Sequence, residues 1–176
     1  MKKFFTTTLV FFILTQTFGQ TQRKISTYLF AQYDKTLYDI TLGNNPWGAG
    51  LGIQAFLNIK TKFKLTIEVA HDIYLEDDKL LRLDSTGHAI NDFRDVTNLF
   101  AGLSFHPSND IYISFLTGPS FINGRTILGI KPSFGFYFSK KQKWTGKISY
   151  INIFKRDKAT KGDFGSLAFA VGLKLF

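Results

Sequence analysis

The stretch His106-Pro107-Ser108-Asn109 offers the residue types of nucleophilic catalysis at close spacing. In an extended strand, side chains two residues apart lie on the same face, so His106 and Ser108 could act as a general base and its nucleophile. Pro107 argues against this pair, because proline removes a backbone donor and breaks a strand. The segment from Pro107 to Asp110 fits a tight turn better, since Pro, Ser, Asn and Asp all favour turns. We therefore expect a turn here and no catalytic residue.

Other residues that could do chemistry are scattered. The residue types of a catalytic triad are present in His71, Asp84, Ser85 and His88. The last three fall in an expected loop, where such polar residues are ordinary. No two histidines stand at ligand spacing, and the sequence has no glycine-rich phosphate loop and no cysteine. The sequence therefore predicts no enzyme, no metal site, no cofactor and no disulfide framework.

The first twenty residues, MKKFFTTTLVFFILTQTFGQ, have the parts of a secretory signal peptide. A basic start precedes the apolar stretch Phe4–Leu14, which is too short to span a bilayer as a helix. The small residue Gly19 follows, just before polar residues, as at a signal-peptide cleavage site, although the residues before it do not form the ideal pattern. We predict a signal peptide at residues 1–19 and one mature domain at residues 20–176, located beyond the inner membrane.

Alternation of apolar and polar residues dominates the mature sequence, and no window approaches the roughly 20 apolar residues of a membrane helix. We expect eight strands, at residues 23–33, 47–59, 63–74, 96–106, 111–121, 126–138, 144–154 and 164–176. Most of these strands have 11 to 13 residues. That length exceeds the usual strand of about 5 to 6 residues and suits a tilted bilayer crossing.

The expected connections alternate between tight turns and longer loops. The longer ones are Asp34–Pro46, Leu75–Asp95 and Lys155–Asp163, and the shorter Ile122–Arg125 falls at the same end. Outer-membrane barrels are built this way, with short periplasmic turns and longer extracellular loops, and an even strand number leaves both termini on the periplasmic side.

The two faces of each expected strand differ in a way that favours a membrane barrel. Residues 47–59 place Leu51 and Ile53 on one face and Gly50, Gly52 and Gln54 on the other. A soluble barrel would be expected to carry many charged side chains on its solvent-exposed face. The polar face of this strand instead carries small, uncharged side chains, which suit a narrow lumen. A secreted soluble barrel that binds a small apolar ligand is the alternative.

Two features concern the ends of the strands. Aromatic residues cluster near both ends and predict two girdles at the headgroup levels. The girdle residues are Phe63, Phe105, Phe138, Trp144 and Phe176 at the short-turn end, and Trp47, Tyr74, Phe154 and Phe164 at the long-loop end. Pro119 and Pro132 fall inside expected strands, where we expect bulges near the rim. Phe176 is out of phase with the apolar face of its strand, so we expect a bulge near Lys174 or a Phe176 side chain that turns inward.

Four charged residues fall on the expected lumen face. These are Lys64, Glu68, Lys131 and Lys147. A buried charge needs a partner, so Glu68 is expected to pair with Lys131 or Lys147 across the interior. The cluster could form a gate or an ion path, but a plug of paired charges is favoured, because an eight-stranded barrel has room only for side chains.

The last loop is basic. It carries Lys155, Arg156, Lys158 and Lys161 against Asp157 and Asp163. Facing outward, these basic residues would contact the phosphates of lipopolysaccharide; an ordinary solvated loop is the alternative. The net charge of +9 does not indicate nucleic-acid binding, because the chain is expected to be exported and its basic residues are dispersed.

The signal, the eight strands, the loop asymmetry and the final Phe176 together resemble the small outer-membrane β-barrel families, such as the transmembrane domain of outer membrane protein A and its short relatives. The resemblance implies insertion by the barrel-assembly machinery, which recognises a last strand ending in an aromatic residue. It also implies a structural, adhesive or lipid-contacting role more often than an open pore. The stretch at His106 is similar to the His-x-Ser-Asn pattern of outer-membrane lipid A deacylases, but the expected topology puts it on the periplasmic side.

We therefore predict an all-β integral protein of the cell outer membrane, an eight-stranded antiparallel up-and-down transmembrane β-barrel with a filled lumen. It would act without catalysis, as a surface-binding protein or as a subunit of an envelope complex. Its partners would be outer-membrane lipid, lipopolysaccharide and a protein of the envelope. A lipid A-modifying enzyme on the same barrel is the second hypothesis.

Overall fold

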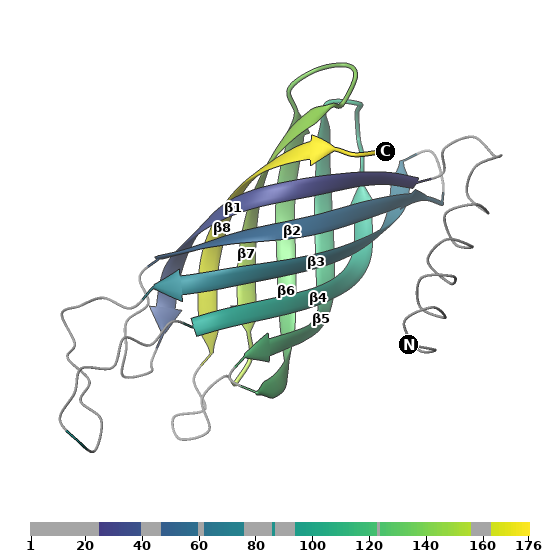
Figure 1. The fold of residues 1–176 in the computed structure, drawn as a ribbon. Helices are drawn as coiled ribbons and strands as arrows, with labels where there is room; N and C mark the ends of the chain where they lie inside the picture. The colour runs from purple at the N-terminus through teal and green to yellow at the C-terminus, as the bar shows by residue number, and fades with distance from the viewer. Residues whose placement is uncertain are drawn as a thin grey trace, which may run out of the picture.

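The computed structural model describes residues 25–39, 47–59, 62–75, 86, 94–122, 124–155 and 163–176. The strands are β1 (Ile25–Asp39), β2 (Trp47–Asn58), β3 (Phe63–Leu75), β4 (Arg94–Phe105), β5 (Ile111–Ile122), β6 (Arg125–Tyr137), β7 (Trp144–Ile153) and β8 (Phe164–Lys174). Each strand pairs antiparallel with its neighbours in sequence, and β8 pairs with β1, so the sheet closes into a barrel (Figure 1). The expected signal peptide lies outside the described residues.

No helix among the described residues is long and apolar enough to span a membrane.

Strand β1 is the one whose extent differs most from the sequence prediction. The other seven begin and end within two residues of their expected bounds, whereas β1 continues to Asp39 instead of ending at residue 33. Asp34 and Lys35 suggested the start of a loop, but they alternate across the sheet, with Asp34 buried and Lys35 exposed. The expected loop Asp34–Pro46 therefore begins only after Asp39.

The two prolines interrupt the sheet without shifting its register. Between β4 and β5 the pairs Asn98↔Ser120 and Ala101↔Thr117 keep one register on both sides of Pro119. The pairing of β6 with β7 likewise keeps its register on both sides of Pro132. The predicted bulges at the prolines were therefore wrong. Among the described pairings, the one shift of register lies between Thr36 and Tyr38, where β1 meets β8.

The strand register fixes the width of the lumen. Asn58 on β2 leads through a row of paired residues around the barrel and back to Gly48, so the row returns to β2 displaced by ten residues. The row consists of Asn58, Lys64, Ser104, Ser114, Ser133, Ser149, Ala168, Asp34 and Gly48. A displacement of this kind means that the strands are tilted, by roughly 35–45° in barrels of this size. Such a barrel has an interior that side chains just fill.

The two ends of the barrel differ. The start of β1, the end of β8 and the connections β2–β3, β4–β5 and β6–β7 share one end, which we call the short-turn end (Figure 1). The Gln142 side chain in the β6–β7 turn donates to the Asn109 carbonyl at 2.8 Å, and the Tyr28 hydroxyl donates to the Gln142 carbonyl at 3.0 Å. These bonds tie two of the turns and the first strand together across that end.

Candidate functional site

An ion cluster occupies the centre of the lumen. Glu68 on β3 lies between Lys131 on β6 and Lys147 on β7, with Nζ–Oε distances of 2.5 and 2.6 Å. All three side chains are buried. Lys147 also donates to Gln54 Oε1 at 3.3 Å and lies 4.2 Å from the centre of the Phe30 ring. Each charge therefore has an opposite charge beside it, which offsets the cost of removing it from water.

A second polar group adjoins the cluster on its long-loop side. The Asp72 carboxylate accepts hydrogen bonds from the side-chain amides of Gln32 at 2.5 Å and Asn98 at 3.4 Å. Ser120 donates to the Asn98 side-chain carbonyl at 2.6 Å. Asp34 is fully buried, yet neither of its carboxylate oxygens accepts a hydrogen bond of normal geometry from a described residue. Lys131 attracts both aspartates electrostatically.

The two polar groups form one layer, which we call the central layer. It holds three carboxyl groups, on Asp34, Glu68 and Asp72, against two ammonium groups, on Lys131 and Lys147. In a narrow lumen with little water, this excess of one carboxylate leaves Asp34 as the member without a matched partner. Sequence reasoning missed both aspartates. Asp72 shares the parity of Glu68 along β3, so the same alternation identifies it, whereas Asp34 fell in an expected loop.

An aromatic layer packs inside the barrel at the short-turn end. It is formed by Tyr28, Phe30, Phe56, Tyr112, Tyr137 and the ring of His106. The His106 ring stacks on Tyr112 with 5.3 Å between centres and meets the edge of Phe56 at the same distance. Burial, and to a smaller extent the charge of Lys64, lower the pKa of His106 to about 4. The histidine is therefore a neutral ring of this layer at physiological pH.

His106 and Ser108 do not form a catalytic pair. The His106 side chain is buried in the aromatic layer, whereas Ser108 is exposed in the β4–β5 turn. The Ser108 hydroxyl accepts a hydrogen bond from the backbone N–H of Asp110 at 3.2 Å. This is the local bond of a turn, as the sequence of this segment predicted.

An apolar layer packs inside the barrel at the opposite end. It consists of Tyr74, Val96, Ile122, Ile151, Ile153, Phe164 and Ala168. The Tyr74 and Phe164 rings meet edge to face at 5.0 Å, and the Tyr74 hydroxyl lies 3.0 Å from that of Ser166. Tyr74 and Phe164 were predicted to lie in a lipid-facing girdle, which was wrong. Both residues have the parity of the lumen face and fill the barrel instead.

The remaining predicted site residues lie apart from the ion cluster. Lys64 is half-buried at the short-turn end, with its Nζ 5.6 Å from the centre of the Phe56 ring. The backbone N–H of Lys155 donates to the Asp163 carboxylate at 2.8 Å beyond β7. Arg156, Lys158 and Lys161 lie outside the described residues, so the structure does not place the basic loop as a whole.

The suggested triad is not assembled by the described residues. His71 faces outward from β3, with its Nδ1 2.8 Å from the Thr97 hydroxyl. Asp84, Ser85 and His88 lie outside the described residues. Within the part of the chain that the structure describes, no group of three His, Cys, Asp or Glu residues could hold a metal ion.

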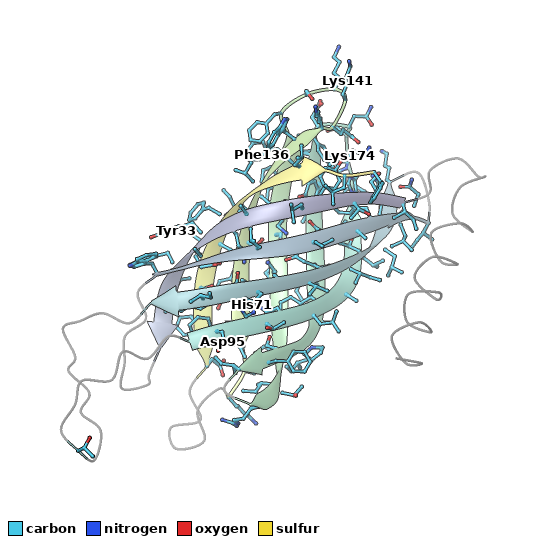
Figure 2. The ribbon with its side chains drawn as sticks, in the orientation of Figure 1. Tyr33, His71, Asp95, Phe136, Lys141 and Lys174 are labelled. Carbon is cyan, nitrogen blue, oxygen red and sulfur yellow. The ribbon has the colours of Figure 1, made fainter. Side chains whose placement is uncertain are left out.

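The exterior of the barrel is apolar. Side chains project outward from the strands (Figure 2), and Leu, Ile, Val and Phe are exposed along the barrel. Leu51 on β2 and Phe115 on β5 are 62% and 56% exposed. Soluble proteins rarely leave apolar surface of this extent in water. Aromatic residues mark both borders, with Phe63, Phe105, Phe138, Trp144 and Phe176 at the short-turn end and Tyr33, Tyr38, Trp47 and Phe121 opposite.

Phe176 lies beyond the regular part of β8. The strand ends at Lys174, and the backbone N–H of Leu175 still donates to the Thr27 carbonyl at 2.8 Å. The Phe176 side chain is 67% exposed, and the pairing of β8 with β1 shows no shift of register near Lys174. Both expectations for this residue, a bulge and an inward side chain, were therefore wrong. Because β8 ends at Lys174, Phe176 no longer follows the alternation of the strand, and its side chain can be exposed despite its position in the sequence pattern.

An apolar exterior with two aromatic borders and a filled polar interior defines a transmembrane β-barrel of the small bacterial outer-membrane type. A secreted soluble barrel would place its apolar face inside, so that alternative was wrong. The predicted fold class is confirmed, and the predicted location in the outer membrane agrees with this fold and this exterior.

The comparisons with solved structures agree with this class. The crystal structure of Ail, the attachment invasion locus protein of Yersinia pestis, matches with a TM-score of 0.57 and 11% identity over 86% of this chain and 97% of that one. The structure of Ail in a phospholipid bilayer nanodisc matches with a TM-score of 0.55 and 11% identity, over 85% of this chain and 99% of that one. The structure of Ail in complex with the heparin analogue sucrose octasulfate matches with a TM-score of 0.54 and 13% identity, over 86% of this chain and 97% of that one. At these identities the likeness concerns the fold.

No family model and no curated protein matches the sequence.

Proposed function

We propose that the protein is a closed, non-catalytic barrel of the outer membrane that acts through the segments joining its strands at the long-loop end. The observation that carries the proposal is the lumen itself. An aromatic layer, a central layer of paired charges and an apolar layer follow one another along the barrel. The side chains of these layers occupy the space that water would have to fill in an open pore.

A conductance measurement tests whether the lumen is closed. The purified protein, refolded and inserted in a planar lipid bilayer, is expected to show no stable ohmic steps. A variant that opens the aromatic layer, Tyr112→Ala with Tyr137→Ala, serves as the positive comparison, because both rings fill the lumen. Discrete conductance steps by the unaltered protein would contradict a closed lumen.

The absence of catalysis is part of the proposal. It is supported by the separation of His106, buried among aromatic rings, from Ser108, which is engaged in a turn. The direct test is the acylation pattern of lipid A in cells that carry the His106→Ala or Ser108→Ala variant. An unchanged pattern is expected, and a change in lipid A acylation caused by either variant would support the enzyme hypothesis instead.

Binding at the outer surface is the remaining part of the proposal. The segments 40–46, 76–93 and 156–162 follow the strand ends opposite the short turns, and the last of them contains Arg156, Lys158 and Lys161 next to Lys155. These basic groups suit the phosphates of lipopolysaccharide. Ail, which has the same fold, was solved with a sulfated sugar. Replacement of the four basic residues by Gln is expected to weaken lipopolysaccharide retention during purification, whereas equal retention would remove this role.

Insertion by the barrel-assembly machinery also belongs to the proposal. Phe176 is exposed at the end of β8, where a recognition element would have to be accessible. The Phe176→Ala variant is expected to lower the amount of folded protein in the outer membrane, measured by heat-modifiable gel migration after fractionation. A partner in the envelope would be sought by crosslinking in intact cells.

A further inference from the structure

Lysines gather at the short-turn end of the barrel. The six described there are Lys62, Lys64, Lys140, Lys141, Lys143 and Lys174, and Asp110 is the single acidic residue among the described residues of this end. At the opposite end the charged side chains that the structure describes nearly balance, with Lys35, Arg125 and Lys155 against Asp95 and Asp163. Among the described residues, the excess of positive charge therefore lies at the short-turn end. We call these lysines, without Lys64, the lysine collar, because the Lys64 side chain lies over the lumen ring of Phe56.

The collar stands beside the aromatic border. Lys62 immediately precedes Phe63, and Lys143 immediately precedes Trp144, and both aromatic side chains are 46% exposed on the outer face. Lys174 is two residues from Phe176. Aromatic residues at the border of a membrane protein lie at the level of the lipid headgroups, and lysine side chains extend from apolar stems toward the polar side. The ammonium groups therefore reach the depth of the lipid phosphates.

The collar is held by the sheet and its turns. The backbone N–H of Lys174 donates to the Lys143 carbonyl at 2.8 Å, and that of His106 donates to the Lys62 carbonyl at 2.7 Å. Lys141 and Lys174 extend at the same end of the barrel, away from Asp95 at the other end (Figure 2). The lysines thus keep a fixed height relative to the apolar exterior.

The distribution of the collar around the barrel indicates what it binds. Lys62 lies in the β2–β3 turn and Lys140, Lys141 and Lys143 lie in the β6–β7 turn, four strands away and so on the opposite side of the eight-stranded barrel. An acidic protein docked on one side would contact only part of this set. Lipid headgroups surround a membrane barrel on all sides, and clustered lysines attract anionic lipids.

We propose that the lysine collar binds the headgroups of anionic phospholipids in the leaflet at the short-turn end, and so fixes the depth and orientation of the barrel. This leaflet faces the periplasm in the topology of outer-membrane barrels. The proposal concerns a surface distinct from the long-loop end, so it stands even where the loops bind nothing. It needs only that the barrel spans a membrane.

The test measures the lipid selectivity of the folded protein. The unaltered protein is placed in nanodiscs of phosphatidylcholine and phosphatidylglycerol at three to one, and the lipids retained on release are counted by native mass spectrometry. The collar variant Lys62→Gln/Lys143→Gln is compared with the matched control Lys35→Gln/Arg125→Gln at the other end. Heat-modifiable gel migration verifies that both variants are folded.

The unaltered protein is expected to enrich phosphatidylglycerol, and the collar variant to lose the enrichment by about tenfold, since each surface lysine adds to the attraction. The control is expected to keep it. Raising the salt concentration is expected to weaken the enrichment of the unaltered protein, a test that needs no variant. Equal enrichment in the collar variant and the unaltered protein, or equal loss in both variants, would overturn the proposal. Loss of a crosslinked periplasmic protein without any change in lipid enrichment would assign the collar to a protein partner instead.

Discussion

Glu68 Oε1 lies 2.5 Å from Lys131 Nζ at the centre of the barrel, and the second oxygen of the same carboxylate lies 2.6 Å from Lys147. One anion therefore serves two buried cations. Strand β3 pairs with neither β6 nor β7, so the cluster spans the lumen and links opposite walls. This bridging makes Glu68 the residue whose loss leaves the most uncompensated charge.

The Glu68→Gln variant is expected to be strongly destabilised. A neutral amide would leave two ammonium groups buried side by side without a carboxylate between them, and removal of one partner of a buried ion pair typically costs about 3–5 kcal/mol. Urea titration of the protein folded in detergent micelles, followed by gel migration without heating, measures the loss. A midpoint equal to that of the unaltered protein would contradict the role given to Glu68.

The Asp34→Asn variant is expected to have the opposite effect on stability. Asp34 is fully buried without a normal hydrogen bond to its carboxylate, and its layer already has one carboxyl group more than ammonium groups. Replacement by an uncharged amide of the same shape removes the unmatched charge. We expect an unchanged or higher urea midpoint, by up to about 2 kcal/mol. A loss similar to that of Glu68→Gln would show that the Asp34 carboxylate is needed.

Much of the fold could be predicted because period-two alternation and turn residues specify both the strands and their faces. The same alternation places Lys131 and Lys147 in the lumen with Glu68. It also places Tyr74 and Asp72 there, although the aromatic character of Tyr74 suggested a girdle. Parity along a strand was thus a better guide than residue type at strand ends.

Other features depend on the register, which single-strand patterns do not contain. Asp34 was missed because a charged pair in sequence looked like the start of a loop, and only pairing with β8 shows that β1 continues. The one-sided lysine collar appears only when the β2–β3 turn, the β6–β7 turn and the end of β8 are brought to the same end of the barrel. The row that returns to β2 displaced by ten residues likewise needs all eight pairings, so the alternation within single strands could not establish how narrow the lumen is.

Stability is expected to fall as the pH decreases from about 6.5 to about 4, in part through His106. The pKa of His106 is about 4 in the folded protein because burial disfavours the charged ring, against an ordinary value of 6.5. Over this window the unfolded chain binds a proton that the folded protein does not, which favours unfolding by up to about 3 kcal/mol at the acidic end. The effect is absent above pH 6.5.

The variant His106→Phe isolates this contribution. Phenylalanine keeps a ring between Tyr112 and Phe56 but does not titrate in this range. Urea midpoints of the two proteins are measured at several values between pH 4 and pH 8, and the other titratable groups are common to both. The variant is expected to lose less stability on acidification. A difference that stays constant with pH would show that the histidine is not neutral when folded.

The Gly135→Ala variant is expected to be destabilised by overpacking of the aromatic layer. A methyl group at Gly135 would overlap the ring of Tyr112 on the neighbouring strand. Overpacking of a filled interior costs about 1–3 kcal/mol. Ser133→Ala, two residues earlier on the same face of β6, is the control, since its hydroxyl has no partner among the described residues. Combining Gly135→Ala with Tyr112→Leu is expected to recover part of the loss, and strict additivity of the two changes would contradict the overlap.

A charge on the outer face distinguishes a lipid-facing barrel from one in water. Val69 in the middle of β3 and Phe63 at its short-turn end are both 46% exposed, so their accessibility is matched. In a bilayer, Arg at the midplane costs about 2–4 kcal/mol, whereas Arg near the interface costs about 0–1 kcal/mol. Val69→Arg is therefore expected to be clearly destabilised in vesicles and Phe63→Arg only slightly, measured by urea unfolding from liposomes. Equal small effects would mean that Val69 faces water, because a surface charge in water is nearly free, and the membrane-spanning role of these strands would then be wrong.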